Sequence, residues 1–214
     1  MTEPLGQIEK PEVSKFLGKK KIYLVPLLLR GHESPVEYIE KVELYWKQVV
    51  EHIASLEMKI GKVNHVYHES ILSAGDEGLN FLEKVSPESF RIAKDKCQNG
   101  ATLEVIEDKE LLEESMDWER FLMIGFMSEK VARLVTDSYL EAYRKRYEYI
   151  AQKLNGMLKE GEAALLFLRE GHRVQFPKDI EVFSVAPPIL NELHRWLRDR
   201  QAKQEKEQKE TNPP

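Results

Sequence analysis

The chain has 214 residues and a mass of 25.0 kDa, which suits one large domain or two small ones. Apolar residues make up 42% of it, enough to exclude wholesale disorder. The 37 acidic and 32 basic side chains give a net charge of −5, which argues against a general nucleic-acid-binding surface. The single cysteine, Cys97, excludes a disulfide framework or a multi-cysteine metal site. Because no apolar run approaches the ~20 residues of a membrane span and the N-terminus lacks signal-peptide order, we expect a soluble, cytoplasmic protein.

The first predicted element is a strand over residues 22–29. A continuous apolar run lies there between Lys19–Lys21 and Arg30, which is typical of a strand buried on both faces in a parallel sheet. Pro26 cannot donate a hydrogen bond to a neighbouring strand. Its presence therefore predicts either a bulge or a position at the edge of the sheet.

Apolar residues that recur in steps of three and four predict two long amphipathic helices. The first begins at Ser34–Glu37, with an N-cap serine, a proline at the first helical position and a capping-box glutamate, and it ends at Gly61. The second runs from Glu129, after the N-cap Ser128, to about Leu158. The first is about 38 Å long at 1.5 Å per residue. Helices of such matching length are expected to pack against each other.

Shorter predicted elements complete the chain: strands over 63–72, 102–106, 163–168 and 180–185, and helices over 87–98, 108–124 and from Pro188. This alternation predicts an α/β fold with a mostly parallel or mixed central sheet of about five strands and the two unusually long amphipathic helices. The last two strands are expected to pair antiparallel because their connection is short. We expect a flexible N-terminal segment (1–18), a single α/β domain (19–200) and a disordered charged tail (201–214).

Histidine and glutamate residues follow several predicted strands. They are His32 and Glu33 after the first, His68 and Glu69 at the end of the second, and His172 after the fourth. Ligand groups collect at the carboxyl ends of parallel strands, and imidazole with carboxylate binds divalent transition metals or forms an acid–base pair. One hypothesis is therefore a metal-assisted hydrolase, with the three histidines as metal ligands and Glu33 or Glu69 as the base. The alternative is that polar residues occur there because loops are exposed. Whether the protein is an enzyme stays open.

The leading hypothesis, placed ahead of the hydrolase, is a ligand- or partner-binding domain that self-associates through its long helices. A helix of ~38 Å outgrows a domain whose radius of gyration is about 17 Å. Where the apolar stripes Val36–Leu56 and Val131–Met157 extend beyond the domain, another chain must cover them. A homodimer provides that cover most simply.

The second long helix also carries tyrosines at spacing four among basic residues. They are Tyr139, Tyr143 and Tyr147, with Arg133, Arg144, Lys145 and Arg146. The rings can cover the edge of the core, or the surface can stack on bases and contact phosphates. A helix of this composition followed by a buried strand is similar to parts of the release-factor and ribosome-rescue families, although their Gly-Gly-Gln loop is absent. This likeness is compositional only, and no residue role follows from it. The basic residues of the helix make an RNA- or ribosome-associated factor a third alternative, and the acidic charge balance argues against a nucleic-acid partner.

Overall fold

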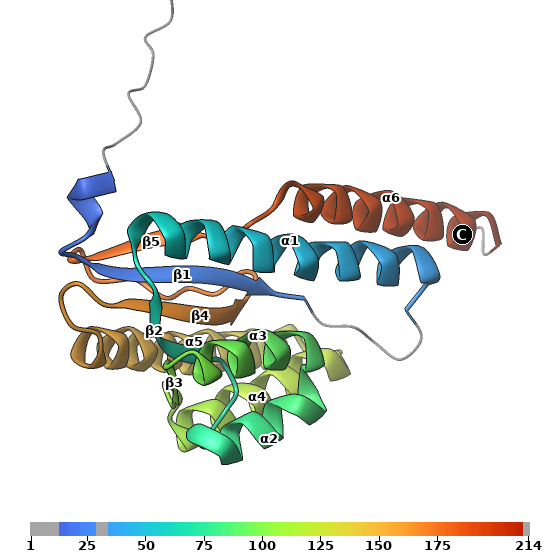
Figure 1. Ribbon diagram of the computed structural model, residues 1–214. Helices are drawn as coiled ribbons and strands as arrows, with labels where there is room; N and C mark the ends of the chain where they lie inside the picture. The colour runs from blue at the N-terminus through green and yellow to red at the C-terminus, as the bar shows by residue number, and fades with distance from the viewer. Residues whose placement is uncertain (1–12, 29–33, 212–214) are drawn as a thin grey trace, which may run out of the picture.

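The computed structural model describes residues 13–28 and 34–211. At its centre is a five-stranded sheet in the order β3-β2-β4-β1-β5, in which every neighbouring pair is parallel (Figure 1). The strands are β1 (Lys20–Leu27), β2 (Val63–His68), β3 (Thr102–Glu104), β4 (Ala163–Arg169) and β5 (Ile180–Ser184). The predicted α/β fold with a sheet of about five strands is thus confirmed.

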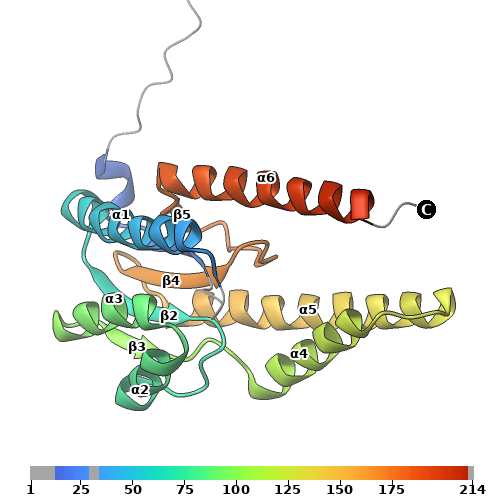
Figure 2. The same ribbon diagram turned by 90° about the vertical axis from the view of Figure 1, so that its right-hand side faces the viewer.

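Helices cover both faces of this sheet. One face packs against α1 (Val36–Ile60), α2 (Gly75–Val85), α3 (Pro87–Gln98) and the start of α6 (Pro188–Thr211). The other packs against α5 (Glu129–Met157), with α4 (Lys109–Ile124) lying on α5 (Figure 2). The sheet therefore separates α1 from α5, and the prediction that these two long helices pack together is wrong. A parallel sheet exposes two apolar faces, and each recruits its own long helix.

Pro26 lies inside the sheet, in a strand with a neighbour on either side. It stands opposite Leu168 of β4 without a shift in register, whereas β5 pairs with β1 only as far as Leu24. Leu24 accepts its hydrogen bond from Val185 on the β5 side, and the residue two further on faces the same side. The side of Pro26 that lacks an N–H therefore faces a position beyond the end of β5. Neither the predicted bulge nor an edge strand is needed.

Three further expectations differ from the structure. β4 and β5 do not pair antiparallel, because residues 170–179 cross β1 and bury Val174 in the core beneath it. The first long helix begins at Val36, with no side-chain hydrogen bond from its N-cap residue Pro35, so the capping box is not formed. The predicted strand over 63–72 ends at His68, and α2 occupies a stretch for which no element was expected.

The short 3-10 helix η1 (Val13–Phe16) precedes β1. At the other end, α6 stays helical as far as Thr211, further than its charged composition indicates. Within the described part of the chain, no helix is both long and apolar enough to cross a membrane.

Candidate functional site

The candidate site lies at the carboxyl edge of the sheet, where β2 and β4 are neighbours. The chain leaves β2 towards α2 on one face, and it leaves β4 through residues 170–179 on the other. In open parallel sheets this divergence of neighbouring connections marks the usual place of ligand sites. Most of the buried charged side chains lie at this edge.

Glu69 and Arg169 link the two strands at this edge. Glu69 is only 5% exposed, and its two carboxylate oxygens accept hydrogen bonds from the backbone N–H and the Nε of Arg169, both at 2.9 Å. Arg169 Nη1 donates to the Tyr143 hydroxyl at 2.6 Å and to Glu119 at 3.2 Å. This network ties β2, β4, α4 and α5 together. Glu69 was predicted to be the general base, but in the structure it holds Arg169 in place.

A second ion pair lies deeper, between Glu107 and Arg146. Their exposed fractions are 4% and 1%, and Arg146 donates to Glu107 from Nε at 2.9 Å and also from Nη2. Glu107 additionally accepts the backbone N–H of Ser70 at 2.9 Å. Ser70 has a φ of 67° and is the one non-glycine residue with positive φ among those described. Such a conformation persists only where the surroundings hold it, and the Ser70 N–H is bound here by the buried Glu107 carboxylate.

His68 is buried on the face that α3 covers. Its Nδ1 lies 2.6 Å from the Glu69 carbonyl oxygen, which can only accept, so Nδ1 carries the proton. Its Nε2 then accepts from the Ser89 hydroxyl at 3.1 Å, and Ser89 contacts the Ser86 hydroxyl at 2.6 Å. Burial lowers the pKa of His68 to about 4, so the ring is neutral at pH 7. No lone pair of its ring nitrogens is left for a metal ion.

His172 lies on the opposite face of the sheet. Its ring packs edge-on against Tyr147 and Phe176, with centroids 6.4 and 5.9 Å away. His68 instead lies against Phe167 in the other core. The two histidines predicted to share a metal ion are therefore separated by the sheet. His32 and Glu33 lie outside the described residues. Among the residues that the structure does describe, no group of three or more His, Cys, Asp or Glu side chains could hold a metal ion.

Three buried polar atoms near Glu69 have no hydrogen-bond partner within the described structure. They are Arg146 Nη1, the Tyr147 hydroxyl and His172 Nδ1. Burial, together with the charge of Glu69, raises the pKa of Tyr147 to about 12. Burial also lowers the pKa of His172, against the opposing effect of Glu69. At neutral pH both side chains are therefore uncharged hydrogen-bonding groups.

A hollow of about 640 Å³ opens between α2 and α4, directly beyond the end of β2. We call it the α2–α4 hollow. Its wall is mostly apolar and its rim is polar, and the residues are Ser70, Leu72, Phe81, Val85, Leu112, Glu113, Met116, Asp117 and Arg120. Its volume lies within the range typical of small-molecule pockets, about 300–1,000 Å³. The strained Ser70 thus lines an apolar hollow at the carboxyl edge.

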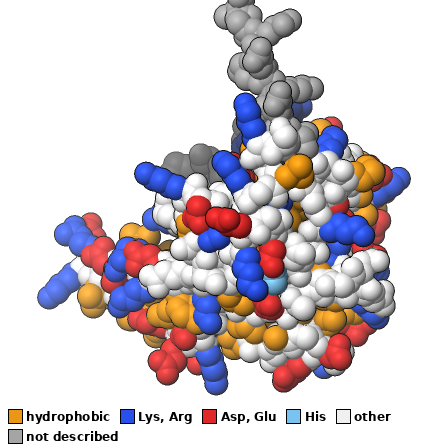
Figure 3. Space-filling view, turned by 60° about the vertical axis from the view of Figure 1, so that its left-hand side comes forward, with side chains coloured by type: hydrophobic (Ala, Val, Ile, Leu, Met, Phe, Trp, Pro, Cys, Tyr) orange, Lys and Arg blue, Asp and Glu red, His pale blue; other side chains and the backbone are white. Residues whose placement is uncertain are grey.

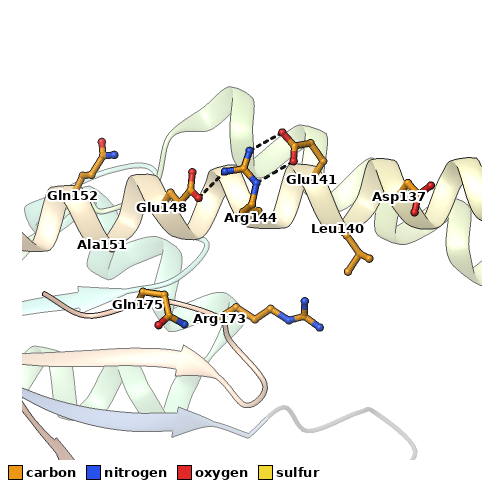
Figure 4. Close-up of a pocket in the computed structure, with 9 residues that line it drawn as sticks. All are labelled: Asp137, Leu140, Glu141, Arg144, Glu148, Ala151, Gln152, Arg173 and Gln175. Atoms are coloured by element: carbon orange, nitrogen blue, oxygen red, sulfur yellow. Dashed lines mark hydrogen bonds and ion pairs between the residues drawn. The ribbon is translucent and has the colours of Figure 1, made fainter.

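A second hollow, of about 550 Å³, lies between α5 and residues 173–175 (Figure 4). Arg144 lines it but is held by Glu141 and Glu148 of its own helix. Arg173 comes from the loop after β4 and makes no ion pair with another described residue. The neutralised Arg144 leaves little net attraction for an anion here, and no buried polar network supports the wall. We therefore regard the α2–α4 hollow as the better candidate.

The tyrosines of α5 pack into the core. Tyr143 and Tyr147 are buried, and Tyr139 contacts Tyr143 with ring centroids 4.6 Å apart, which confirms the interpretation that these rings cover the core edge. Of the basic residues beside them, Arg146 is enclosed with Glu107 and Arg144 is paired on the surface. On the face shown in Figure 3, basic and acidic side chains are intermixed.

Ser70 was missed as a site residue, and Arg146 was considered only as a possible phosphate contact. The signal for Arg146 was its spacing. It lies four residues after Ala142 and four before Ile150, on the apolar side of α5, where a charged side chain requires a buried partner. Ser70 carried no signal, because serine adopts ordinary backbone conformations in most contexts.

Comparison with known proteins does not change this interpretation. No protein-family model matches the chain, and neither the curated proteins nor the solved structures searched include a match. The site is therefore interpreted from its own geometry.

Proposed function

We propose that this α/β domain is a binding protein for a small molecule that has an apolar body and a hydrogen-bonding group such as a hydroxyl. The apolar body would fill the α2–α4 hollow between Phe81 and Met116, and the polar group would meet Ser70 at the inner wall. Apolar walls with a few placed polar groups are the usual composition of such sites. The rim carries Glu113, Asp117 and Arg120, which favours an uncharged ligand over an anion.

One observation carries this proposal, namely the way Ser70 is held. A non-glycine residue in the left-handed region costs of order 1–3 kcal/mol. At this position a buried ion pair, Glu107 with Arg146, maintains the conformation through the Ser70 N–H. Strain that is maintained by a buried network beside a hollow is typical of ligand sites. A simple turn after β2 would need neither the buried charges nor the strain.

The proposal predicts site-specific binding of benzyl alcohol, which has a ring and one hydroxyl. In ¹H–¹⁵N spectra of the full chain, titration should shift the amides of Ser70, Leu72, Phe81 and Met116 in a saturable manner. Met116→Trp should abolish these shifts, because the indole fills the hollow from α4. Met58→Trp is the matched control, since Met58 is 82% exposed on α1 and outside the hollow.

The control variant should bind as the unaltered chain does. Shifts confined to residues 121–134 would contradict the proposal, because the alcohol would then only coat exposed apolar side chains. Shifts around the hollow that persist in Met116→Trp would contradict it as well. Circular dichroism of both variants establishes that the fold is retained.

A further inference from the structure

The helical hairpin formed by α4 and α5 extends beyond the sheet (Figure 2). Its tip has the sequence FLMIGFM over residues 121–127, and most of the side chains there are exposed. Met127 is fully exposed, and Met123 and Ile124 are 76% and 73% exposed. The apolar row continues along α5 through Val131 and Leu134, the latter 64% exposed. An apolar surface of this extent on a projecting element indicates an interaction site.

The exposed part of α5 has the pattern of a helix-pairing seam. Met127 precedes the N-cap residue Ser128, and Val131 and Leu134 follow it in steps of four and three, the latter two on one side of α5. The C-terminal half of α5 turns its own apolar stripe into the core. Only the N-terminal half therefore still has an apolar face without a cover.

We propose that this surface binds a second copy of the chain, with α5 pairing antiparallel to α5 of the partner around a two-fold axis. In a two-fold interface, a contact from one residue to another is repeated with the roles exchanged. Val131 of each copy would then pack against Leu134 of the other. This proposal does not depend on the ligand site.

The charges beside the stripe fit this occupant. Lys130 and Asp137 line a hollow of about 650 Å³ together with Val131 and Leu134. Neither Lys130 nor Asp137 has an ion-pair partner among the described residues, unlike Arg144 further along the same helix. The antiparallel pairing that joins Val131 to Leu134 also brings Lys130 of each copy next to Asp137 of the other. Flanking charges of this kind set partner choice and orientation in paired helices.

A second copy fits this surface better than a lipid surface does. Residues 109–137 carry seven acidic and four basic side chains, so an anionic membrane would repel the hairpin. A surface that carries both signs beside one apolar row is instead complementary to itself.

Sedimentation equilibrium of the full chain tests the proposal. The unaltered chain should approach twice its 25.0 kDa mass as its concentration rises. Leu134→Glu should give a monomer, because it places like charges in the centre of the seam. Met58→Glu is the matched control, since Met58 is 82% exposed on α1, which lies across the sheet from α5, and this variant should dimerise normally.

A charge exchange tests the orientation. Lys130→Asp and Asp137→Lys should each raise the dissociation constant about tenfold, a change of 1.4 kcal/mol, because each juxtaposes like charges at two places. Combining both substitutions should restore the original affinity. A chain that stays monomeric throughout, or that floats with phosphatidylcholine vesicles as a monomer, would overturn the proposal. Dimerisation that is unchanged in Leu134→Glu would also overturn it.

Discussion

Replacing Arg146 with methionine is expected to lower the free energy of unfolding by about 3–5 kcal/mol. Methionine fills much of the same volume, so the loss comes mainly from the charge of Glu107, which would stay buried without a counterion. Glu107 is only 4% exposed in the folded chain. Since small domains are stable by only about 5–15 kcal/mol in total, this one substitution removes a large share. Urea unfolding followed by circular dichroism measures it.

Two control variants separate this effect from a general loss of arginine. Arg144→Met removes an exposed arginine from the same helix, where Glu141 and Glu148 are in water, and should cost at most about 1 kcal/mol. The double variant Arg146→Met with Glu107→Leu should recover most of the loss, because no unpaired charge stays buried. If Arg146→Met and Arg144→Met cost the same, the buried ion pair has no structural importance.

The second large effect is a dependence of stability on pH through His68. Burial holds the pKa of this histidine at about 4 in the folded chain, against 6.5 for the free side chain. Because the folded pKa is the lower one, the unfolded chain binds the proton more readily between these values. Stability is therefore fully present above pH 6.5 and is lost as the pH falls from 6.5 towards 4. At about 1.4 kcal/mol per pKa unit, the loss reaches about 3 kcal/mol.

His68→Gln isolates this contribution. Glutamine can still donate to the Glu69 carbonyl but does not titrate, so its unfolding free energy should vary less over the same pH range. Other titrating groups act in both proteins and cancel in the difference. The difference between the two urea-unfolding curves should grow from pH 4 to pH 6.5 in favour of the histidine. Parallel curves would show that the ring is accessible to protons in the folded state.

The sequence predicted the elements of this fold better than their arrangement. Continuous apolar runs located β1 and β4, and spacings of three and four located α1 and α5. The connection between β4 and β5 misled us, because its length is typical of a hairpin. It crosses β1 instead, since the burial of Val174 replaces the packing that a crossover helix usually provides. The start of α2 was missed because its N-cap residue, Ala74, gives no capping signal.

The candidate site was located in part. Reading the ends of the strands placed His68 and Glu69 at the carboxyl edge, where the structure has them. What could not be read from the sequence was where each side chain points and which partner it meets. His68 turns into the core beneath α3, and Glu69 binds an arginine 100 residues away. The positive φ of Ser70 and its hydrogen bond to Glu107 are properties of the folded chain only.

The claim that the α2–α4 hollow is a ligand site can be tested by a crystal structure of the full chain grown with benzyl alcohol. We expect density for the aromatic ring between Phe81 and Met116, with the hydroxyl within hydrogen-bond distance of Ser70, whose φ remains positive. Alcohol bound only at the exposed hairpin tip would contradict the claim. So would a Ser70 with ordinary backbone angles and no opening between α2 and α4.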